Sequence, residues 1–324
     1  MLSLSQLQTV ISEKINNLNI EKEPQNLYAP VSYTLASGGK RIRPVLCLAA
    51  CNLFSENIEP AVPAALAVEV FHNFTLLHDD IMDDSPIRRN KETVHKKWNN
   101  NIAILSGDTM MIKAYELLAE LPQNLLKPVL KLFNETALGV CEGQQYDMDF
   151  ENRQQVSESE YLKMIKLKTS VLIAASLKAG AICGGATEKD AGLLYDFGLN
   201  LGAAFQIQDD LLDVYADTSA FGKQRGKDIL TGKKTFLLTK ALEIADKETK
   251  NKLQYLINNS NIPETEKINA VTKIYEMLNI KKEAENKISE YHDIAIKSMN
   301  KVSVTPDKKQ ELLNFASQIM KRKK

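Results

Sequence analysis

Apolar residues recur along almost the whole chain at the three- and four-residue spacing of an α-helix. The first such set is Leu4, Leu7, Ile11, Ile15 and Leu18. Alternating patterns typical of strands are nearly absent, so we predict an all-α fold. The expected helices span residues 4–18, 24–36, 41–53, 60–84, 101–120, 124–148, 158–182, 188–216, 236–258, 263–278, 280–301 and 306–321.

Two segments lack the helical pattern. Residues 85–97 are polar and unpatterned, which predicts a loop. Residues 217–234 contain three glycines among basic side chains, which predicts a basic loop. No repeat or low-complexity linker divides the chain, so we predict one all-α domain over residues 1–324.

The charges of the chain balance: 41 lysines and arginines against 41 aspartates and glutamates in 324 residues. A net charge of zero gives no electrostatic support for nonspecific nucleic-acid binding, which usually shows as a basic excess. The apolar stretch at residues 61–70 is short and contains Glu69, and the N-terminus lacks a basic segment followed by an apolar run. We therefore expect no membrane span and no signal peptide, and a cytoplasmic protein.

The cysteines are Cys47, Cys51, Cys141 and Cys183. They form no Cys-X-X-Cys pair, and no histidine lies at zinc-finger spacing from them. We expect neither a disulfide framework nor a zinc site, but buried, unpaired thiols in a reducing compartment.

Two clusters with the pattern Asp-Asp-X-X-Asp lie near the C-terminal ends of two apolar helices. They contain Asp79, Asp80 and Asp83, and Asp209, Asp210 and Asp213. In each cluster the first and last carboxylates share one helix face, where like charges repel and the helix dipole disfavours anions. A single cluster is more often a solvated acidic helix end. Two copies in strongly apolar sequence favour a site for Mg²⁺, which takes one or two carboxylates and keeps positions for water and substrate phosphates.

Basic residues near the clusters are candidates for binding an anion. Lys40 and Arg43 follow a glycine pair at a helix start, where backbone can approach an anion closely. A basic turn without a ligand is the alternative for this segment. Further candidates are Arg88 and Arg89 after the first cluster, Lys168 and Thr169 within an apolar helix, and Lys223 and Lys233 in the basic loop. With metal ions, these cations predict a site that ionises diphosphate esters.

The motifs resemble those of the trans-isoprenyl diphosphate synthases, the family of farnesyl and geranylgeranyl diphosphate synthases. In chain order they are GGKRIRP, HDDIMD, RR, GQQYD at 143–147, LKT, FQIQDDLLD, GK and GKKT. Their order and spacing make the resemblance specific over roughly residues 28–240. It implies an all-α fold around a central cavity between the two aspartate-bearing helices, and a homodimer.

The resemblance also implies roles for individual residues. Asp79 and Asp83 would ligate two Mg²⁺ ions with Asp80 in support, and Asp209 would hold a third with Asp210 and Asp213 nearby. The allylic diphosphate would contact Arg88, Lys168, Gln206, Lys223 and Lys233. The diphosphate of isopentenyl diphosphate would contact Lys40, Arg43, His72 and Arg89. Thr169 would lie near the developing cation. For His72, a hydrogen-bonded core histidine is the alternative.

The implied reaction joins isopentenyl diphosphate head to tail with an allylic diphosphate. Mg²⁺ would neutralise the charge on the leaving diphosphate, and an apolar, closed cavity would protect the allylic cation from water. The released diphosphate would then remove the proton, because no side-chain base is evident.

Product length depends in this family on bulky residues below the first cluster. Phe74 and Thr75 stand five and four residues before Asp79, a combination that resembles geranylgeranyl (C20) rather than animal-type farnesyl (C15) synthases. The helical wheel does not put Phe74 on the face of Asp79, and Phe71 lies further down, so ordinary core is the alternative for both aromatics. We expect C20 products, with C15 as the alternative.

Two other functions remain open. A class I terpene cyclase also uses an aspartate-rich helix, but its second motif is typically an Asn/Ser/Glu triad and it lacks the GGKRIRP site. A noncatalytic synthase subunit tends to lose one aspartate cluster, whereas both are whole here. The C-terminal tail, residues 321–324, either folds over the isopentenyl diphosphate site or frays.

Overall fold

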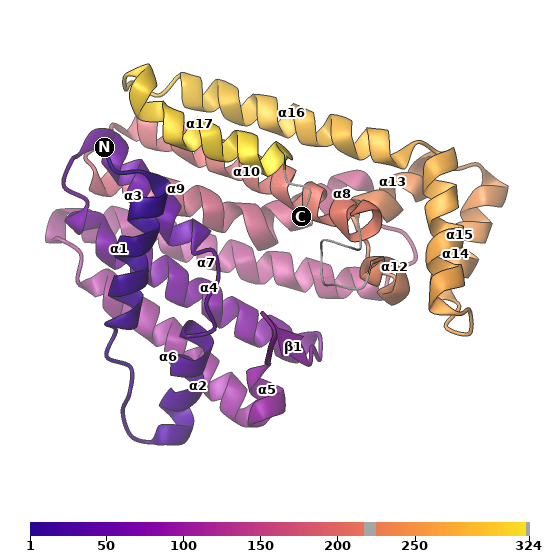
Figure 1. The fold of residues 1–324 in the computed structure, drawn as a ribbon, viewed down its shortest axis with the longest axis horizontal. Helices are drawn as coiled ribbons and strands as arrows, with labels where there is room; N and C mark the ends of the chain where they lie inside the picture. The colour runs from indigo at the N-terminus through magenta and orange to yellow at the C-terminus, as the bar shows by residue number, and fades with distance from the viewer. Residues whose placement is uncertain (217–224, 322–324) are drawn as a thin grey trace. The chain divides into compact units, whose positions relative to one another are not determined.

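The computed structural model of the protein describes residues 1–216 and 225–321 and confirms the all-α prediction (Figure 1). Within these residues, the strands form a two-stranded hairpin of β1 (Ile87–Arg88) and β2 (Lys91–Glu92). The helices are α1 (Leu4–Asn16), α2 (Gln25–Leu35), α3 (Ile42–Phe54), α4 (Val62–Met82), α5 (Val94–Lys97), α6 (Asn100–Ala119), α7 (Gln123–Glu151), α8 (Glu158–Ile165), α9 (Val171–Cys183), α10 (Glu188–Tyr215), α12 (Lys227–Thr231), α13 (Phe236–Ile244), α14 (Lys247–Asn258), α15 (Glu264–Met277), α16 (Ile280–Asn300) and α17 (Pro306–Lys321). A 3₁₀ turn, Glu59–Ala61, precedes α4, and a π-helical turn, Lys166–Ser170, joins α8 to α9.

The residues group into two compact units. Unit 1 contains Met1–Asn134, Ala175–Tyr195 and Ser303–Glu311. Unit 2 contains Glu135–Ala174, Asp196–Val302 and Leu312–Lys324. The prediction of one domain over residues 1–324 stays a prediction, and each unit is described by itself below.

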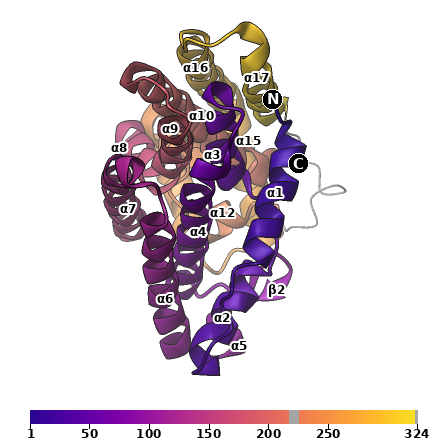
Figure 2. The ribbon, with the colours of Figure 1, turned by 90° about the vertical axis from the view of Figure 1, so that its left-hand side faces the viewer.

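Helix α4 is the core helix of unit 1. It packs against α3, α6, α1 and α2, which lie around it in Figure 2. Among the described residues, the stretch Glu59–Met82 is apolar and long enough to cross a membrane by length and composition. However, 67% of its most apolar window is buried within the protein, as in the core helix of a folded domain.

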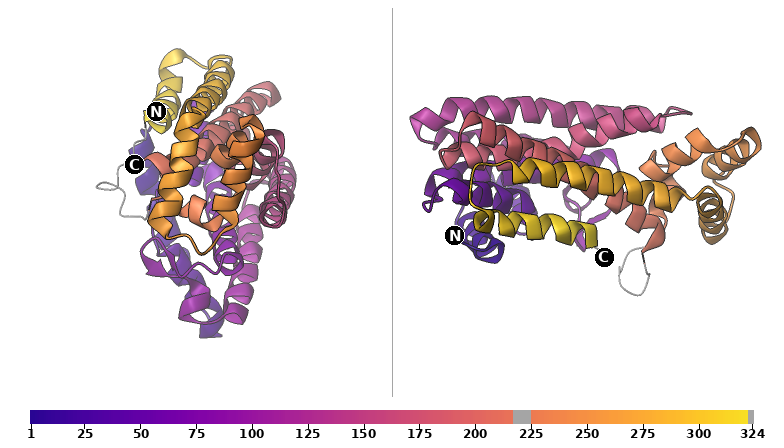
Figure 3. Two further views of the ribbon diagram at one scale, coloured as in Figure 1. Left: turned by 90° about the vertical axis from the view of Figure 1, so that its right-hand side faces the viewer. Right: turned by 90° about the horizontal axis from the view of Figure 1, so that it is seen from above.

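Unit 2 has its own core, built on the second half of α10. Aromatic side chains fill this core, among them Tyr161, Phe236 and Tyr275, each at most 2% exposed. Helices α8 and α13 pack together in the same unit, and α13 also packs against α16. Helices α14 and α15, drawn in orange in Figure 3, form a helical pair at the end of the unit.

The segment 85–97 is not the irregular loop that we expected. Arg89 and Asn90 both have left-handed backbone, with φ of 52° and 62°, which closes a two-residue hairpin between β1 and β2. Helix α5 follows directly. The pattern gave no signal because each strand has two residues and neither turn position is a glycine.

The cysteine prediction holds for three of the four thiols. Cys47, Cys51 and Cys183 are buried and unpaired. Cys141 is also unpaired, but it is exposed on α7, so the prediction of a buried thiol is wrong there. Burial raises the pKa of Cys51 to about 11, which keeps this thiol protonated and inert at neutral pH.

The π-helical turn replaces the continuous helix expected over residues 158–182. Two glycines of unit 2 press against it. A methyl group at Gly143 of α7 would lie 2.2 Å from the backbone nitrogen of Lys168, and one at Gly202 of α10 would lie 2.7 Å from Cα of Ser170. Single-turn π insertions occur frequently at functional sites, and this one carries Lys168 and Thr169.

We predict that Gly143→Ala lowers the free energy of unfolding by roughly 2–3 kcal/mol, because the new methyl group meets rigid backbone. The measurement is urea denaturation. Gly139→Ala is the matched control on the same helix, since its nearest neighbours would be side-chain atoms at 3.6 Å and 3.8 Å. The control should be neutral or up to about 1 kcal/mol more stable, because alanine favours helix. Equal stability of the two variants would contradict this account of the π turn.

Candidate active site

The first aspartate cluster lies at the C-terminal end of α4, in unit 1. Asp83 is the C-cap of the helix, and its backbone N–H donates to the carbonyl of Asp79 at 2.9 Å. Arg88, from the hairpin, binds both preceding carboxylates: Nε donates to Asp80 at 2.6 Å and Nη2 donates to Asp79 at 3.1 Å. The structure therefore joins Asp79, Asp80 and Arg88, three of the residues predicted from the sequence.

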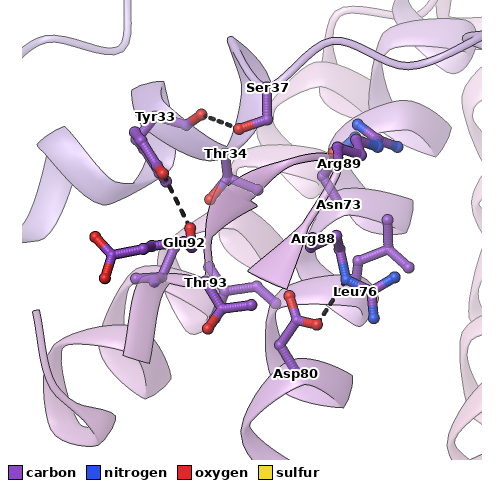
Figure 4. Close-up of a pocket in the computed structure, with 12 residues that line it drawn as sticks. Tyr33, Thr34, Ser37, Asn73, Leu76, Asp80, Arg88, Arg89, Glu92 and Thr93 are labelled. Carbon is purple, nitrogen blue, oxygen red and sulfur yellow. Dashed lines mark hydrogen bonds and ion pairs between the residues drawn. The ribbon is translucent and has the colours of Figure 1, made fainter. Parts of the chain in front are cut away.

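Asp80 is the buried member of this cluster, with 5% of the residue exposed. Burial raises its pKa, and the Arg88 guanidinium opposes that shift. Beside this pair lies a cavity of about 30 Å³, whose lining includes Asn73, Asp80 and Arg89 (Figure 4). The cavity has room for roughly two water molecules and is far too small for a prenyl chain.

A second group of predicted residues, also in unit 1, surrounds His72. Nη1 of Arg43 and Nε2 of His72 are 3.0 Å apart, and a guanidinium N–H of Arg89 donates to the carbonyl of Gly38. The pKa of His72 is held well below its usual value, first by burial and then by the charges of Arg43 and Arg89. The imidazole is therefore neutral at neutral pH and accepts the Arg43 bond.

The guanidinium of Arg43 has a hydrogen-bond donor without a partner. Its Nε is buried and has no hydrogen-bond partner, and burial lowers the pKa of the guanidinium to about 10. A buried donor without a partner is costly, so this arrangement favours an anionic ligand. Lys40 belongs to the same turn and is exposed. Arg43, His72 and Arg89 thus lie together as one basic group, called the basic pocket below, and its binding of a diphosphate stays a prediction.

The second aspartate cluster lies in unit 2, at the end of α10. Asp209 is exposed, whereas Asp210 is 5% exposed and firmly bonded. The hydroxyl of Tyr161 donates to Asp210 at 2.5 Å, and the backbone N–H of Phe236 donates to the same oxygen at 2.9 Å. These two bonds hold Asp210 in place near the end of α10. Its expected place beside a metal ion held by Asp209 stays a prediction.

Asp228 is a neighbour of the second cluster to which the sequence analysis assigned no role. Its backbone N–H donates to the Asp213 carboxylate at 3.1 Å. Burial, then the charge of Asp228, raises the pKa of Asp210 to about 7 and that of Asp213 to about 6, while Lys233 opposes both shifts. The signal was present in the sequence: an aspartate in the first turn of the short helix after the second cluster.

The π turn presents two predicted residues in unit 2. Nζ of Lys168 bonds to the Asp147 carboxylate at 2.6 Å, and the Thr169 hydroxyl donates to Gln206 at 3.2 Å. Asp147 ends the GQQYD run, which the sequence analysis singled out without assigning this aspartate a role. Gln206 in turn donates to Asp210 at 3.4 Å, so the π turn is connected to the second cluster.

Some predicted features are not tested by these contacts. Lys223 and the tail residues 322–324 lie outside the described residues, as does the Lys321 side chain. The sharing of one diphosphate by the two aspartate clusters would span the two units and stays a prediction.

The carboxylates fit a hard divalent cation by their chemistry. Within residues 1–216 and 225–321, no three Asp, Glu, His or Cys side chains are arranged to hold a metal ion by themselves. A metal ion at either cluster would therefore need further oxygen ligands. Mg²⁺ meets this condition, because it usually binds one or two carboxylates and completes its shell with water and substrate phosphates.

Comparison with known proteins identifies the family of the chain. A sequence model of the polyprenyl synthetase family matches residues 24–278. The chain belongs to the polyprenyl synthetase family. It is 44% identical over 236 residues to a geranylgeranyl diphosphate synthase of Methanosarcina mazei, covering 72% of each chain. It is 36% identical over 333 residues to one of Sulfolobus acidocaldarius, covering 99% of this chain and all of that one.

Solved structures agree with this polyprenyl synthetase assignment. A crystal structure of a geranylgeranyl pyrophosphate synthase matches the whole chain with a TM-score of 0.95 and 44% identity. One from Pyrococcus horikoshii matches 98% of each chain with a TM-score of 0.93 and 32% identity. As a polyprenyl synthetase, the chain is a trans-prenyltransferase.

The acidic group of unit 2 generates a prediction about pH. A raised pKa means that the folded state binds more protons than the unfolded state. The stability that Asp210 and Asp213 contribute therefore falls as pH rises from 3.8, their usual pKa, towards about 7. Asp228→Asn should relieve the repulsion at pH 8 and stabilise the metal-free protein by roughly 1 kcal/mol.

Thermal unfolding at pH 8 and pH 5, with and without Mg²⁺, measures this effect. The stabilisation by Asp228→Asn should be smaller at pH 5, where the carboxyls of Asp210 and Asp213 are largely protonated. The stabilisation by added Mg²⁺ should also be smaller in the variant. A lower melting temperature of Asp228→Asn at pH 8 without metal would show that Asp228 stabilises the group and would refute the repulsion.

Proposed function

We propose that the protein condenses isopentenyl diphosphate head to tail with allylic diphosphates and releases geranylgeranyl diphosphate, in a Mg²⁺-dependent reaction. The observation that carries the proposal is the incompletely satisfied basic pocket of Arg43, His72 and Arg89 beside the first aspartate cluster. A second diphosphate site of this kind serves a synthase and has no use in a cyclase. The names of the Methanosarcina mazei and Sulfolobus acidocaldarius relatives support the C20 product.

The two substrates would bind to different sets of residues. Lys40, Arg43, His72 and Arg89 would bind isopentenyl diphosphate, with the neutral imidazole orienting the Arg43 guanidinium. Arg88, Lys168, Gln206, Lys223 and Lys233 would bind the allylic diphosphate. For Arg88 and Lys168 this requires exchange of the carboxylate partners that they have in the free protein.

Three Mg²⁺ ions are expected with substrate bound. Asp79, Asp80 and Asp83 would hold two of them, and Asp209 and Asp213 the third, near Asp228. Bound Mg²⁺ would neutralise charge on the leaving diphosphate as the C–O bond breaks.

The remaining chemistry belongs to side chains of the protein. Thr169, held by Gln206, would place its oxygen near the allylic cation. Apolar side chains would exclude water, which would otherwise quench the cation. Isopentenyl diphosphate would attack through its double bond, and the released diphosphate would take the proton.

The experiment is incubation of the pure protein with Mg²⁺, labelled isopentenyl diphosphate and each allylic primer in turn, followed by chromatography of the dephosphorylated products. We expect C20 alcohol as the main product and no turnover after chelation of the metal. A C15 product would favour the farnesyl alternative. Cyclic hydrocarbons without incorporation of isopentenyl diphosphate would indicate a cyclase, and complete inactivity would favour a noncatalytic subunit.

Phe74 is the candidate for the floor of the product cavity. It is partly buried and forms an aromatic group with Phe71 at 5.5 Å and His78 at 4.7 Å between ring centroids. Phe71 also contacts Phe133 at 5.1 Å and is fully buried, so Phe71 fits a core role better.

We predict that Phe74→Ala shifts the products towards chains longer than C20, because removal of the ring opens space below the first cluster. The measurement is the same chromatography. Phe54→Ala removes another partly buried phenylalanine of unit 1 and should leave chain length unchanged. An unaltered product distribution in Phe74→Ala would remove this residue as the floor.

A homodimer in the cytoplasm is part of the proposal. Helix α6 supports the dimer, because Ile104, Leu105, Ile112 and Tyr115 lie on one helix face and are 37–63% exposed. A second copy of this chain would cover that apolar face. Sedimentation of the pure protein measures the oligomeric state directly.

A further inference from the structure

Glu69 is a buried carboxylate of unit 1 that the proposed reaction does not use. It lies in α4, ten residues before Asp79, which is about 15 Å along the helix axis. Its Oε1 accepts from Nη1 of Arg41 at 2.5 Å and from Nδ2 of Asn73 at 2.8 Å. The side chains of Arg41 and Glu69 are only 7% and 2% exposed.

Arg41 connects this carboxylate to the turn before α3. It is the N-cap of α3 and has left-handed backbone, with φ of 49° and ψ of 35°. Its guanidinium also donates to the carbonyl of Leu35, the last residue of α2. A left-handed arginine is strained, so the buried contacts of its side chain must hold it in place.

The same turn sets the position of two cations of the basic pocket. Arg43 follows Arg41 by two residues in the first turn of α3. Arg89 donates to the carbonyl of Gly38, which belongs to the turn. A shift of the turn would therefore move both guanidiniums, although neither of them is hydrogen-bonded to Glu69, whose side-chain partners are Arg41 and Asn73.

Glu69 also lies within electrostatic range of these cations. Its charge opposes the lowering of the pKa by burial at both Arg43 and Arg89. His72 is neutral and cannot contribute to this balance.

We propose that Glu69 is a positioning residue for isopentenyl diphosphate: through its ion pair with Arg41 it fixes the turn that aims Arg43 and Arg89 at the substrate diphosphate. The proposal rests on the proposed function of the basic pocket. The proposed effect of Glu69 is on the orientation of the two guanidiniums. The charge of Glu69 alone would change the affinity for diphosphate in the opposite direction. Loss of the Glu69 charge makes the pocket more positive, which by Coulomb's law alone would strengthen diphosphate binding.

The first variant is Glu69→Gln, which keeps the shape and removes the charge. We expect the KM for isopentenyl diphosphate to rise at least tenfold, while kcat and the KM for the allylic diphosphate stay within about twofold. Glu69→Asp keeps the charge and should recover part of the loss. An unchanged or lower KM for isopentenyl diphosphate in Glu69→Gln overturns the proposal. So does an equal rise of both KM values, which would indicate a structural role only.

The second variant is the double substitution Arg41→Met with Glu69→Leu. Breaking a buried ion pair can unfold a protein, whereas replacing both members by apolar residues of similar size is often neutral for stability. The double variant should therefore melt close to the wild type and still show the raised KM for isopentenyl diphosphate. A folded double variant with the wild-type KM would overturn the proposal even if the single variants fail to fold.

Two controls separate this inference from the proposed function. Glu158→Gln breaks a partly buried ion pair with Lys240, 2.9 Å long, in unit 2 and should leave the KM for isopentenyl diphosphate unchanged. Arg43→Gln should raise it. If Arg43→Gln has no effect, the assignment of the basic pocket fails; if only the Glu69 variants have no effect, the positioning role fails.

Discussion

Negative charge concentrated at helix ends is the constraint on which this structure depends. Arg88 compensates Asp79 and Asp80 at the end of α4, and Tyr161 and a backbone amide stabilise Asp210 at the end of α10. Burial removes much of the solvent screening that such carboxylates would otherwise have. Asp228 adds further charge beside Asp213 instead of relieving it. The repulsion that remains in the free protein is what the proposed cation–diphosphate complex would relieve, so substrate binding and stability would depend on the same electrostatics.

Helix α4 separates the acidic and basic groups of unit 1 along its length. His72 precedes Asp79 by seven residues, which is about 10 Å along one helix. The spacing between His72 and the first aspartate cluster is therefore fixed by helix geometry, whereas Arg43 and Arg89 reach the basic pocket from α3 and from the hairpin. Condensation of two diphosphate esters requires such a separation. The two anions must bind close enough to react, and each must keep its own set of cations. The buried Glu69–Arg41 pair lies on the basic side of this arrangement, where it serves orientation.

Most helices could be predicted because their apolar spacing is a local property. The failures have identifiable causes. The hairpin over residues 87–92 depends on left-handed backbone at Arg89 and Asn90, which ordinary residues rarely adopt. The break within 158–182 is a π turn, pressed by Gly143 and Gly202 from distant helices, so no pattern within the segment could reveal it. Residues 236–258, expected as one helix, form α13 and α14 because Asp246 caps the second one.

In the candidate site, too, features formed by neighbouring residues could be predicted, whereas contacts between residues far apart in the sequence could not. The aspartate clusters could be recognised because their members are neighbours on one helix. Tyr161 and Asp210 are 49 residues apart, and Arg41 and Glu69 are 28 apart, so their pairing depends on the fold. A partner for Glu69 could nevertheless be expected from the sequence, since a carboxylate inside an apolar helical run cannot stay buried without one. The sequence can therefore indicate that a partner exists, and the tertiary structure is needed to identify the partner and the backbone turn that it holds.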